Sequence, residues 1–400
     1  MKAQTLKGFR DFLPVDAIKR NFLRDKIRRV FELWGYDPLE TPTLEYEELF
    51  KGQIGEDEKL FFKFEDTGGR KVALRYDQTV PACRVVGQYQ DKLPIPFKRY
   101  QIQPAFRAEN PQKGRYREFL QCDADIWGIP SPIADAEVIA LSLAIYKELG
   151  FKKAIVRIND RKLLKDYPYE AIVAIDKLKK IGPDGVIADM QKKGISEEKA
   201  KEYLEKVTNL EPNDTIKTIF AMLEKLGYPK DWYKFDSTIA RSFAYSDGPI
   251  WEVEIPEYQS GSVLGGERFD KLTANVSGRD IPGTGFAIGF DRTLEAMEEL
   301  GLFPTQKTVS QVLVTIFSPE LEEKSIEISS RLRSNNINTE LYLDKDVKID
   351  KQLKYADQKG IPYVVIIGPD EKEKDLITLK NMKTREQKKI KLNDLSNELV

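Results

Sequence analysis

The chain of 400 residues contains no histidine. This absence excludes serine–histidine and cysteine–histidine catalytic triads, HExxH metal sites and acid–base chemistry by an imidazole. Any catalysis must therefore use carboxylates, the fixed positive charges of arginine and lysine, or a bound metal ion. Compositional drift in a lysine- and isoleucine-rich proteome is the simplest explanation for the missing residue type.

Cysteines, long apolar runs and an excess of charge of one sign are also scarce. Cys83 and Cys122 are isolated in the sequence, which is typical of small half-buried residues and not of a disulfide or a metal site. No apolar run approaches the about 18 residues of a membrane span, and no signal-peptide pattern opens the chain. We therefore expect a cytoplasmic protein with no membrane partner. The 64 basic and 65 acidic residues leave only local patches to attract a nucleic acid.

The most informative stretch is 98–128, KRYQIQPAFRAENPQKGRYREFLQCDADIWG. It predicts two strands, at about 100–106 and 118–127, joined by a long basic loop. Alternation places Glu118, Leu120, Cys122, Ala124 and Ile126 on one side of the second strand, and Phe119, Gln121, Asp123 and Asp125 on the other. A glutamine and two aspartates on one face of an apolar strand indicate that the sheet binds a polyanion and a small polar ligand.

Two further segments carry polar or glycine-rich patterns at strand ends. Asp77 and Thr79 lie where a strand gives way to a helix; the aspartate is either a helix cap or a counter-ion for an ammonium group. A glycine-rich strand at 283–289 leads into a helix from Asp291. Its glycine spacing does not fit a dinucleotide fingerprint, and glycines inside a strand more often permit close approach by a ligand or another backbone. The chain has no Walker A sequence.

The length predicts two to three domains. Residues 1–162 and 234–302 form two parts of one β-rich core. Residues 163–233 form a helical insertion, because lysine becomes more frequent, β-branched runs disappear, and glycine and proline separate the helical segments. Residues 303–310 are a linker, and 311–400 form a separate α/β domain with strands at 311–317, 339–343 and 362–367. Its local excess of basic residues comprises Lys383, Arg385, Lys388, Lys389 and Lys391. This cluster is weak support for RNA binding, because such runs are usually solvated.

Three stretches resemble the motifs of class II aminoacyl-tRNA synthetases: a proline-terminated helix and strand near the start, FRAE followed by a basic loop and REFLQCDADIWG, and GTGFAIGFDR before a helix. The segments GFRDFLP, LRYDQTVP, NPQKGRYREF, GGERFDKL and KQLKYADQKGIPYVVIIG are similar to the histidyl-tRNA synthetase family. The resemblance implies an α+β fold, with a six-to-seven-stranded antiparallel sheet flanked by helices. It also implies a homodimer built on the first motif and a carboxy-terminal α/β anticodon-binding domain.

The same resemblance implies ATP-dependent activation of L-histidine and its transfer to tRNA(His). Arg107 would bind the ATP α-phosphate and the amino-acid carboxylate, and Glu109 the adenine amino group. Tyr116 would order the loop over the nucleotide, and Arg292 would bind the γ-phosphate. Arg241 would lie beside the α-phosphate and the amino acid, where related synthetases keep a metal ion. No protein-bound metal is expected, only Mg²⁺ with ATP.

The resemblance also assigns a histidine pocket. Asp77, Gln78 and Thr79 would surround the substrate ammonium, and Gln121 and Asp125 would reach its side chain. An imidazole needs an acceptor for its N–H, and Asp125 can provide one.

One stretch departs from the family pattern. The family has arginine-glycine-leucine-aspartate-tyrosine-tyrosine where this chain has Arg241-Ser-Phe-Ala-Tyr245-Ser246. Tyr245 remains, but Ser246 replaces the tyrosine that normally lines the imidazole pocket. This change makes histidine specificity the part of the prediction most in need of a test.

In the basic loop, Gln112 and Arg115 would lie towards the acceptor end of the tRNA. A rival hypothesis is a non-catalytic paralogue that senses histidine or uncharged tRNA and regulates another enzyme. Intact Arg107, Arg241 and Arg292, together with a complete carboxy-terminal domain, favour the enzyme.

Overall fold

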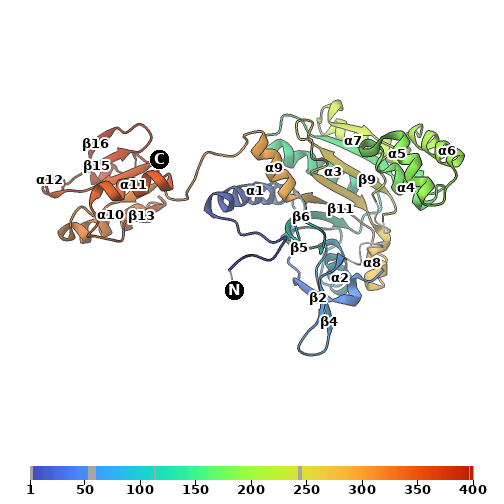
Figure 1. Cartoon of the computed structure of the whole chain (residues 1–400), viewed down its shortest axis with the longest axis horizontal. Helices are drawn as coiled ribbons and strands as arrows, with labels where there is room; N and C mark the ends of the chain where they lie inside the picture. The colour runs from blue at the N-terminus through green and yellow to red at the C-terminus, as the bar shows by residue number, and fades with distance from the viewer. Residues whose placement is uncertain (1–2, 53–59, 112–113, 242–245, 396, 400) are drawn as a thin grey trace. The chain divides into compact units, whose positions relative to one another are not determined.

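The structure is a computed structural model that describes residues 3–52, 60–111, 114–241, 246–395 and 397–399. The chain divides into two compact units (Figure 1). One comprises Met1–Asp11 and Phe22–Phe303, and the other comprises Phe12–Asn21 and Pro304–Val400. None of the described helices is long and apolar enough to cross a membrane.

The larger unit is built on an eight-stranded sheet in the order β1-β5-β6-β11-β10-β9-β7-β8. The strands are β1 (Asp37–Pro38), β5 (Phe97–Phe106), β6 (Glu118–Trp127), β7 (Ile155–Asp160), β8 (Tyr233–Phe235), β9 (Pro249–Glu254), β10 (Leu264–Arg268) and β11 (Gly283–Gly289). The six inner strands pair antiparallel, whereas β1 pairs parallel to β5 and β8 parallel to β7. The six antiparallel strands confirm the antiparallel sheet that the resemblance implies, and the two short edge strands extend it to eight.

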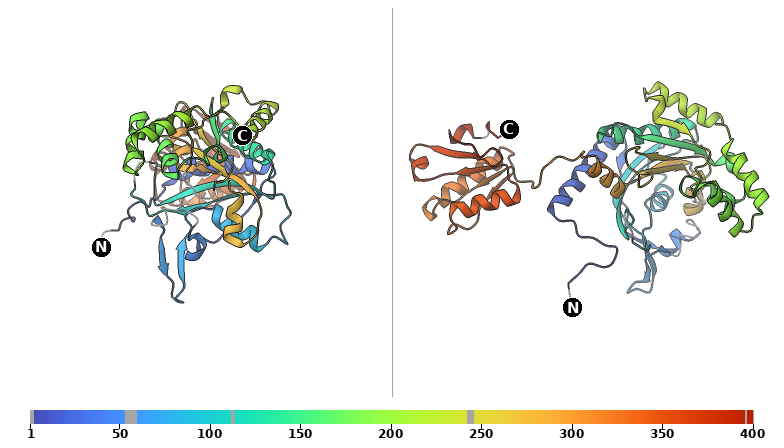
Figure 2. Two further views of the ribbon diagram at one scale, coloured as in Figure 1. Left: turned by 90° about the vertical axis from the view of Figure 1, so that its right-hand side faces the viewer. Right: turned by 45° about the horizontal axis from the view of Figure 1, so that its top comes forward.

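Helices cover one face of this sheet (Figures 1 and 2), and the main hydrophobic core lies on that face. Helices α1 (Pro14–Leu33), α3 (Pro132–Glu148) and α9 (Phe290–Glu299) contribute buried side chains to it. From β6, Cys122, Ala124 and Ile126 face this core, as the alternation predicts. Gln121 and Asp125 therefore lie on the opposite face, where the polar ligand was expected.

A second hydrophobic core covers one end of that opposite face. It includes Trp127, the last residue of β6, together with Phe269 and residues of α2 (Thr79–Gln88) and α8 (Asp270–Ser277). A three-stranded sheet lies beside it, formed by β2 (Leu44–Tyr46), β4 (Lys71–Leu74) and β3 (Lys63–Glu65). Strands β3 and β4 form an antiparallel hairpin, which projects from the unit in Figures 1 and 2. The part of the polar face beyond this core remains accessible to a ligand.

The region predicted as a helical insertion contains four α-helices in the described chain: α4 (Tyr169–Ile175), α5 (Leu178–Lys192), α6 (Glu197–Thr208) and α7 (Asp214–Lys225). The first three share a hydrophobic core of their own. In contrast, Ile216, Ile219 and Leu223 of α7 belong to the main core. Only α4 to α6 thus form a separate layer, and α7 is part of the body of the unit.

The smaller unit has a five-stranded sheet in the order β13-β12-β14-β15-β16. Its elements are β12 (Val312–Val314), α10 (Glu322–Ser334), β13 (Thr339–Leu341), α11 (Ile349–Lys359), β14 (Tyr363–Ile366), α12 (Pro369–Glu373), β15 (Leu376–Asn381) and β16 (Gln387–Lys391). The first three strands pair parallel, as expected for an α/β domain, whereas the antiparallel β15–β16 hairpin was not predicted.

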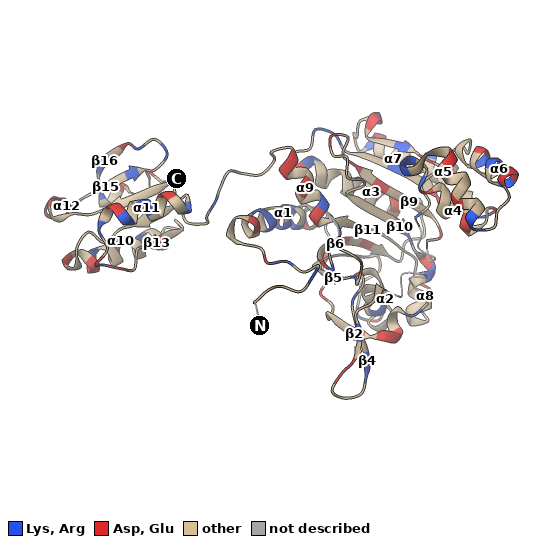
Figure 3. Ribbon diagram, viewed as in Figure 1, with Lys and Arg blue, Asp and Glu red and all other residues tan. Residues whose placement is uncertain are grey.

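Charges of both signs are interspersed over this smaller unit (Figure 3). The predicted basic cluster lies on and around the β15–β16 hairpin. Three of its members form ion pairs within the unit: Arg385 with Asp357, Lys388 with Glu398, and Lys389 with Glu371. Three of the five basic side chains of the cluster therefore have an acidic partner within the unit.

Candidate active site

A cavity of about 750 Å³ lies on the polar side of the main sheet. Its volume is in the range of sites that bind small ligands and cofactors. The predicted residues that line it are Arg107, Glu109, Arg115, Tyr116, Gln121, Arg241 and Arg292. Segments far apart in the sequence thus meet at one cavity, as the motif resemblance requires.

A smaller cavity, of about 70 Å³, adjoins the large one. Arg107, Gln121 and Arg241 border both cavities. The predicted residues found only in the smaller one are Asp77, Thr79 and Asp125. The site therefore consists of a large cavity lined by arginines and a small cavity lined by carboxylates. Arg107 and Arg241 lie at the junction of the two cavities.

Arg107 follows the last residue of β5 and is fixed between two aromatic rings. Its guanidinium carbon lies 4.2 Å from the centre of the Tyr76 ring and 5.0 Å from that of Phe119. Its Nε donates a hydrogen bond of 3.4 Å to the backbone carbonyl of Tyr76. The two rings and the hydrogen bond orient the guanidinium, and an oriented guanidinium can bind a phosphate or carboxylate through two hydrogen bonds.

Arg241 reaches the junction from the segment before β9. Its guanidinium lies directly over Gly265 of β10, where an added Cβ would be 1.7 Å from Nη1. Its Nη2 lies 3.3 Å from Oε1 of Glu267. The absence of a Cβ at Gly265 therefore permits the close approach of the Arg241 side chain.

Asp125 forms a buried ion pair with Arg99, its directly opposite neighbour on β5. Both side chains are almost fully shielded from solvent. Burial raises the pKa of Asp125 to about 6, although the positive charge of Arg99 opposes the shift. The carboxylate lies over Gly285 of β11, where an added Cβ would be 1.8 Å from Oδ1. Arg99 was not among the predicted residues, and only the strand register reveals its role.

Asp77 caps a helix and also borders a cavity. Its Oδ1 accepts a 3.1 Å hydrogen bond from the backbone N–H of Val80, which caps the first turn of α2. The same carboxylate borders the small cavity. Burial raises its pKa to about 6.

Gln78 lines neither cavity, although it was predicted to contact the substrate. Its Nε2 donates to the backbone carbonyls of Gln103, at 2.6 Å, and Gln121, at 3.2 Å. Gln78 therefore ties α2 to β5 and β6. The Gln121 side chain does reach the cavities, and its Nε2 lies 3.1 Å from Oδ1 of Asp123. Asp123 is buried on the same strand face, and burial raises its pKa well above the ordinary value.

Ser246 also lies outside both cavities. Its hydroxyl donates to Glu267, and the residue instead lines a third cavity with Arg161 and Tyr169. Glu267 occupies the wall of the small cavity, where a residue of the 241–246 segment was expected. Glu267 was not predicted; its only sequence signal was a charge in the otherwise apolar and glycine-rich start of β10. Gln112 and Tyr245 lie outside the described residues.

Comparison with known proteins identifies the family. The family model described as histidyl-tRNA synthetase matches residues 8–181, and the model described as anticodon binding domain matches residues 311–400. The histidine–tRNA ligase of Cytophaga hutchinsonii is 35% identical over 98% of this chain and 98% of its own length. The chain belongs to the histidyl-tRNA synthetase family.

Solved structures agree with this assignment. A histidyl-tRNA synthetase from Nostoc sp. PCC 7120 matches with a TM-score of 0.87 and 27% identity, over 100% of this chain and 99% of that one. A structure described as an ATP phosphoribosyltransferase regulatory subunit/histidyl-tRNA synthetase, from Bacillus halodurans C, has a TM-score of 0.71 and 25% identity over 89% of this chain and 97% of that one. The fuller match to ligases favours the enzyme over the regulatory alternative.

The third family motif forms the far wall of the large cavity. Arg292 on α9 donates a 2.9 Å hydrogen bond from Nη1 to the carbonyl of Ser262. The guanidinium carbon of Arg10, from the GFRDFLP segment, lies 3.2 Å from the centre of the Tyr116 ring. Arg10 also forms a 2.9 Å ion pair with Asp291. The start of the chain thus links the second and third motifs at this wall.

The loop end of the large cavity contains an exposed ion pair. Nη1 of Arg115 lies 3.4 Å from Oε2 of Glu109, and Nε of Arg117 donates a 3.0 Å hydrogen bond to the Glu109 carbonyl. The predicted adenine and tRNA contacts are therefore neighbours. Among the described residues, no cluster of three cysteine, aspartate or glutamate side chains could hold a metal ion.

Proposed function

We propose that the protein is a histidine–tRNA ligase. It activates L-histidine with ATP to give histidyl-adenylate and pyrophosphate, and then transfers histidine to the 3′ end of tRNA(His). The observation that carries this proposal is the position of Arg107 and Arg241 at the junction of the two cavities. A carboxylate entering from the small cavity and a phosphate entering from the large one would meet between these two cations.

In the first step, a carboxylate oxygen of histidine forms a bond to the α-phosphorus of ATP, and the bond from that phosphorus to pyrophosphate breaks. The protein must position two anions and neutralise charge on the pentavalent transition state. Arg107 and Arg241 do this at the α-phosphate, and Arg292 binds the γ-phosphate. Glu109 accepts from the adenine amino group, and Tyr116 closes the nucleotide wall. No side chain has to accept a proton, so the lack of histidine is no obstacle.

The small cavity takes the histidine substrate. Asp77 and Thr79 bind its ammonium, and Gln121 contributes a polar contact. Asp125 accepts from one imidazole N–H. Glu267 gives this cavity an additional carboxylate, so an imidazole N–H has a second possible acceptor although Ser246 replaces the family tyrosine.

Mg²⁺ enters this proposal as part of the nucleotide substrate. Mg²⁺ is commonly bound through substrate phosphates, so the ion would arrive on the ATP phosphates. When bound, it would neutralise part of the phosphate charge, and Arg107, Arg241 and Arg292 supply the rest of the compensating charge.

We also propose that the enzyme is a cytoplasmic homodimer that binds tRNA through both units. The match of residues 311–400 to an anticodon-binding model supports the contact of the smaller unit. Gln112 and Arg115 would face the acceptor end. Exposed apolar side chains near the first motif, such as Leu33 on α1, which is 80% exposed, support a dimer interface there.

ATP–pyrophosphate exchange with each of the twenty amino acids tests the proposed function. We expect exchange that depends on histidine, followed by charging of tRNA(His). A purified protein that supports no exchange with any amino acid would contradict the enzymatic proposal. Exchange with another amino acid but not with histidine would contradict only the assignment of the substrate.

The pH dependence of activity tests the two cavity carboxylates. Because burial raises the pKa of both Asp77 and Asp125 to about 6, both lose their charge as the pH falls through that value. At saturating ATP, kcat/KM for histidine should fall below about pH 6, by up to about tenfold per pH unit for each group. Their raised pKa values also mean that ionisation of these groups costs folding stability as the pH rises through 6.

The substrate imidazole itself titrates near pH 6.5, so the profile needs a control. The variant Asp125→Asn retains the substrate ionisation but loses one of the two protein ionisations. Its kcat/KM should therefore decrease less steeply with falling pH than that of the wild type. Identical slopes would show that Asp125 does not titrate in the free enzyme.

A further inference from the structure

The backbone of Arg241 has an unusual conformation. Its φ is +43°, and only three other non-glycine residues in the described chain have a positive φ: Asn336, Asp375 and Arg385. Residues other than glycine rarely adopt this left-handed backbone conformation, so the surrounding structure must stabilise it at Arg241. Because the guanidinium of Arg241 approaches Gly265 so closely, a change of this backbone angle would move it away from the junction.

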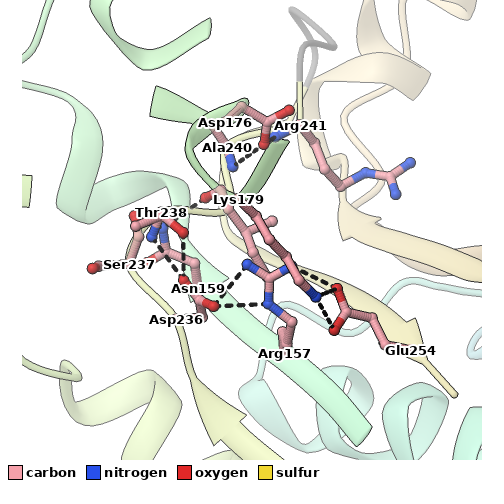
Figure 4. Close-up of polar contacts among 11 residues, drawn as sticks. Arg157, Asn159, Asp176, Lys179, Asp236, Ser237, Thr238, Ala240, Arg241 and Glu254 are labelled. Atoms are coloured by element: carbon pink, nitrogen blue, oxygen red, sulfur yellow. Dashed lines mark hydrogen bonds and ion pairs between the residues drawn. The ribbon is translucent and has the colours of Figure 1, made fainter. Parts of the chain in front are cut away.

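A carboxylate from the helical insertion binds this strained backbone. Oδ1 of Asp176 accepts a 2.8 Å hydrogen bond from the N–H of Ala240 and a 3.3 Å hydrogen bond from the N–H of Arg241 (Figure 4). Asp176 is the residue that directly follows α4. One oxygen thus binds two successive amides, a geometry that orders a backbone because a charged acceptor forms stronger hydrogen bonds than a neutral one.

The residues before Arg241 are also fixed. The Ala240 side chain is buried in the separate core of α4 to α6. The Ala240 carbonyl accepts a 3.1 Å hydrogen bond from Nη1 of Arg161. Nδ2 of Asn159 donates to the carbonyls of Ser237, at 2.9 Å, and Ile239, at 2.8 Å. These contacts therefore fix the backbone of residues 237–240, which leads to Arg241.

A second attachment joins the insertion to the sheet nearby. Nζ of Lys179 on α5 lies 2.6 Å from Oε2 of Glu254 on β9 (Figure 4). Arg157 of β7 pairs with the same Glu254, at 2.9 Å, and with Asp236, at 2.7 Å. The corner between α4 and α5 is thus attached twice, through Asp176 to the Arg241 segment and through Lys179 to the sheet.

We propose that Asp176 is a positioning residue, through which the helical insertion sets the backbone, and hence the guanidinium, of Arg241. This inference rests on the proposed function, because it assigns the insertion a part in adenylate formation. Among the described residues, Asp176 is not part of the lining of either of the two cavities, so we expect it to act through the Ala240–Arg241 backbone. Without it, the two amides lose their charged acceptor, and the backbone relaxes towards negative φ.

Single-turnover adenylate formation tests the proposal. Asp176→Ala should lower the rate about tenfold, the loss expected for one charged hydrogen bond, while the KM for ATP stays unchanged. Asp176→Asn retains an acceptor oxygen and should recover most of the rate. Asp189→Ala is the matched control, because the ion pairs of this insertion carboxylate are with Lys177 and Lys193. It should behave like the wild type.

A double-mutant cycle separates positioning from general stability. In an Arg241→Ala background, Asp176→Ala should cause no further loss of rate, because the guanidinium that Asp176 positions is absent. Additive losses would overturn the proposal, as would an unchanged rate in Asp176→Ala alone. A wild-type protein without exchange activity would instead contradict the proposed function, and an active Arg241→Ala would contradict the role of that arginine.

Discussion

Arg241→Ala is expected to lower the single-turnover rate of histidyl-adenylate formation by about 100- to 1000-fold, with binding of ATP nearly unchanged. The side chain lies at the junction of the two cavities and is only partly exposed. Its positive charge therefore stabilises the transition state, in which negative charge accumulates on the α-phosphate, more than it stabilises bound ATP. In the ground state, Arg107 and Arg292 also bind the nucleotide. An unchanged rate of adenylate formation would show that the role assignment is wrong.

Gly265→Ala tests the placement of the Arg241 guanidinium without removing the arginine. The added methyl group would lie 1.7 Å from Nη1 of Arg241, so the guanidinium must move. Because that group is the flexible end of a long side chain, we expect a large loss of rate with little change in melting temperature. Gly68→Ala, in the turn of the β3–β4 hairpin where the nearest atom is 3.4 Å away, is the control and should keep full activity. Equal activity of the two variants would contradict the need for close approach.

Asp125→Ala is expected to raise the KM for histidine about 10- to 100-fold, and far more than the KM for ATP, because it removes a charged acceptor for the imidazole. The same change leaves Arg99 as a buried, uncompensated charge, which typically costs about 3–5 kcal/mol. Binding and stability must therefore be measured together. Asp125→Asn keeps the shape of the side chain and an oxygen that can accept from Arg99, so it should lose less stability than Asp125→Ala while still raising the KM for histidine.

Asp135→Ala provides a matched control for the loss of stability. Asp135 forms a 2.9 Å ion pair with Arg268, in which the side chains are 1% and 3% exposed, and neither residue lines the two cavities. Breaking this pair should lower the melting temperature without changing the KM for histidine. Equal shifts of the KM for histidine and ATP in Asp125→Ala would indicate that Asp125 has only a structural role.

Local patterns in the sequence determined the essentials of the site. Alternation along β6 placed Gln121 and Asp125 on the face opposite the core, because successive side chains of a strand point to opposite sides. Asp77 was recognised at the start of a helix because capping residues have a characteristic position. Such features depend on neighbours in the chain, so they are visible without the fold.

Only the tertiary structure decided which partners those residues have. Arg99 faces Asp125 because of the strand register, and Glu267 approaches Arg241 because β10 lies beside the segment that carries it. Asp176 meets the same arginine across 65 positions of sequence, through the packing of the insertion. No periodicity encodes these contacts, because they result from how separate elements pack. The sequence could therefore name the arginine of the junction, but not the groups that position it.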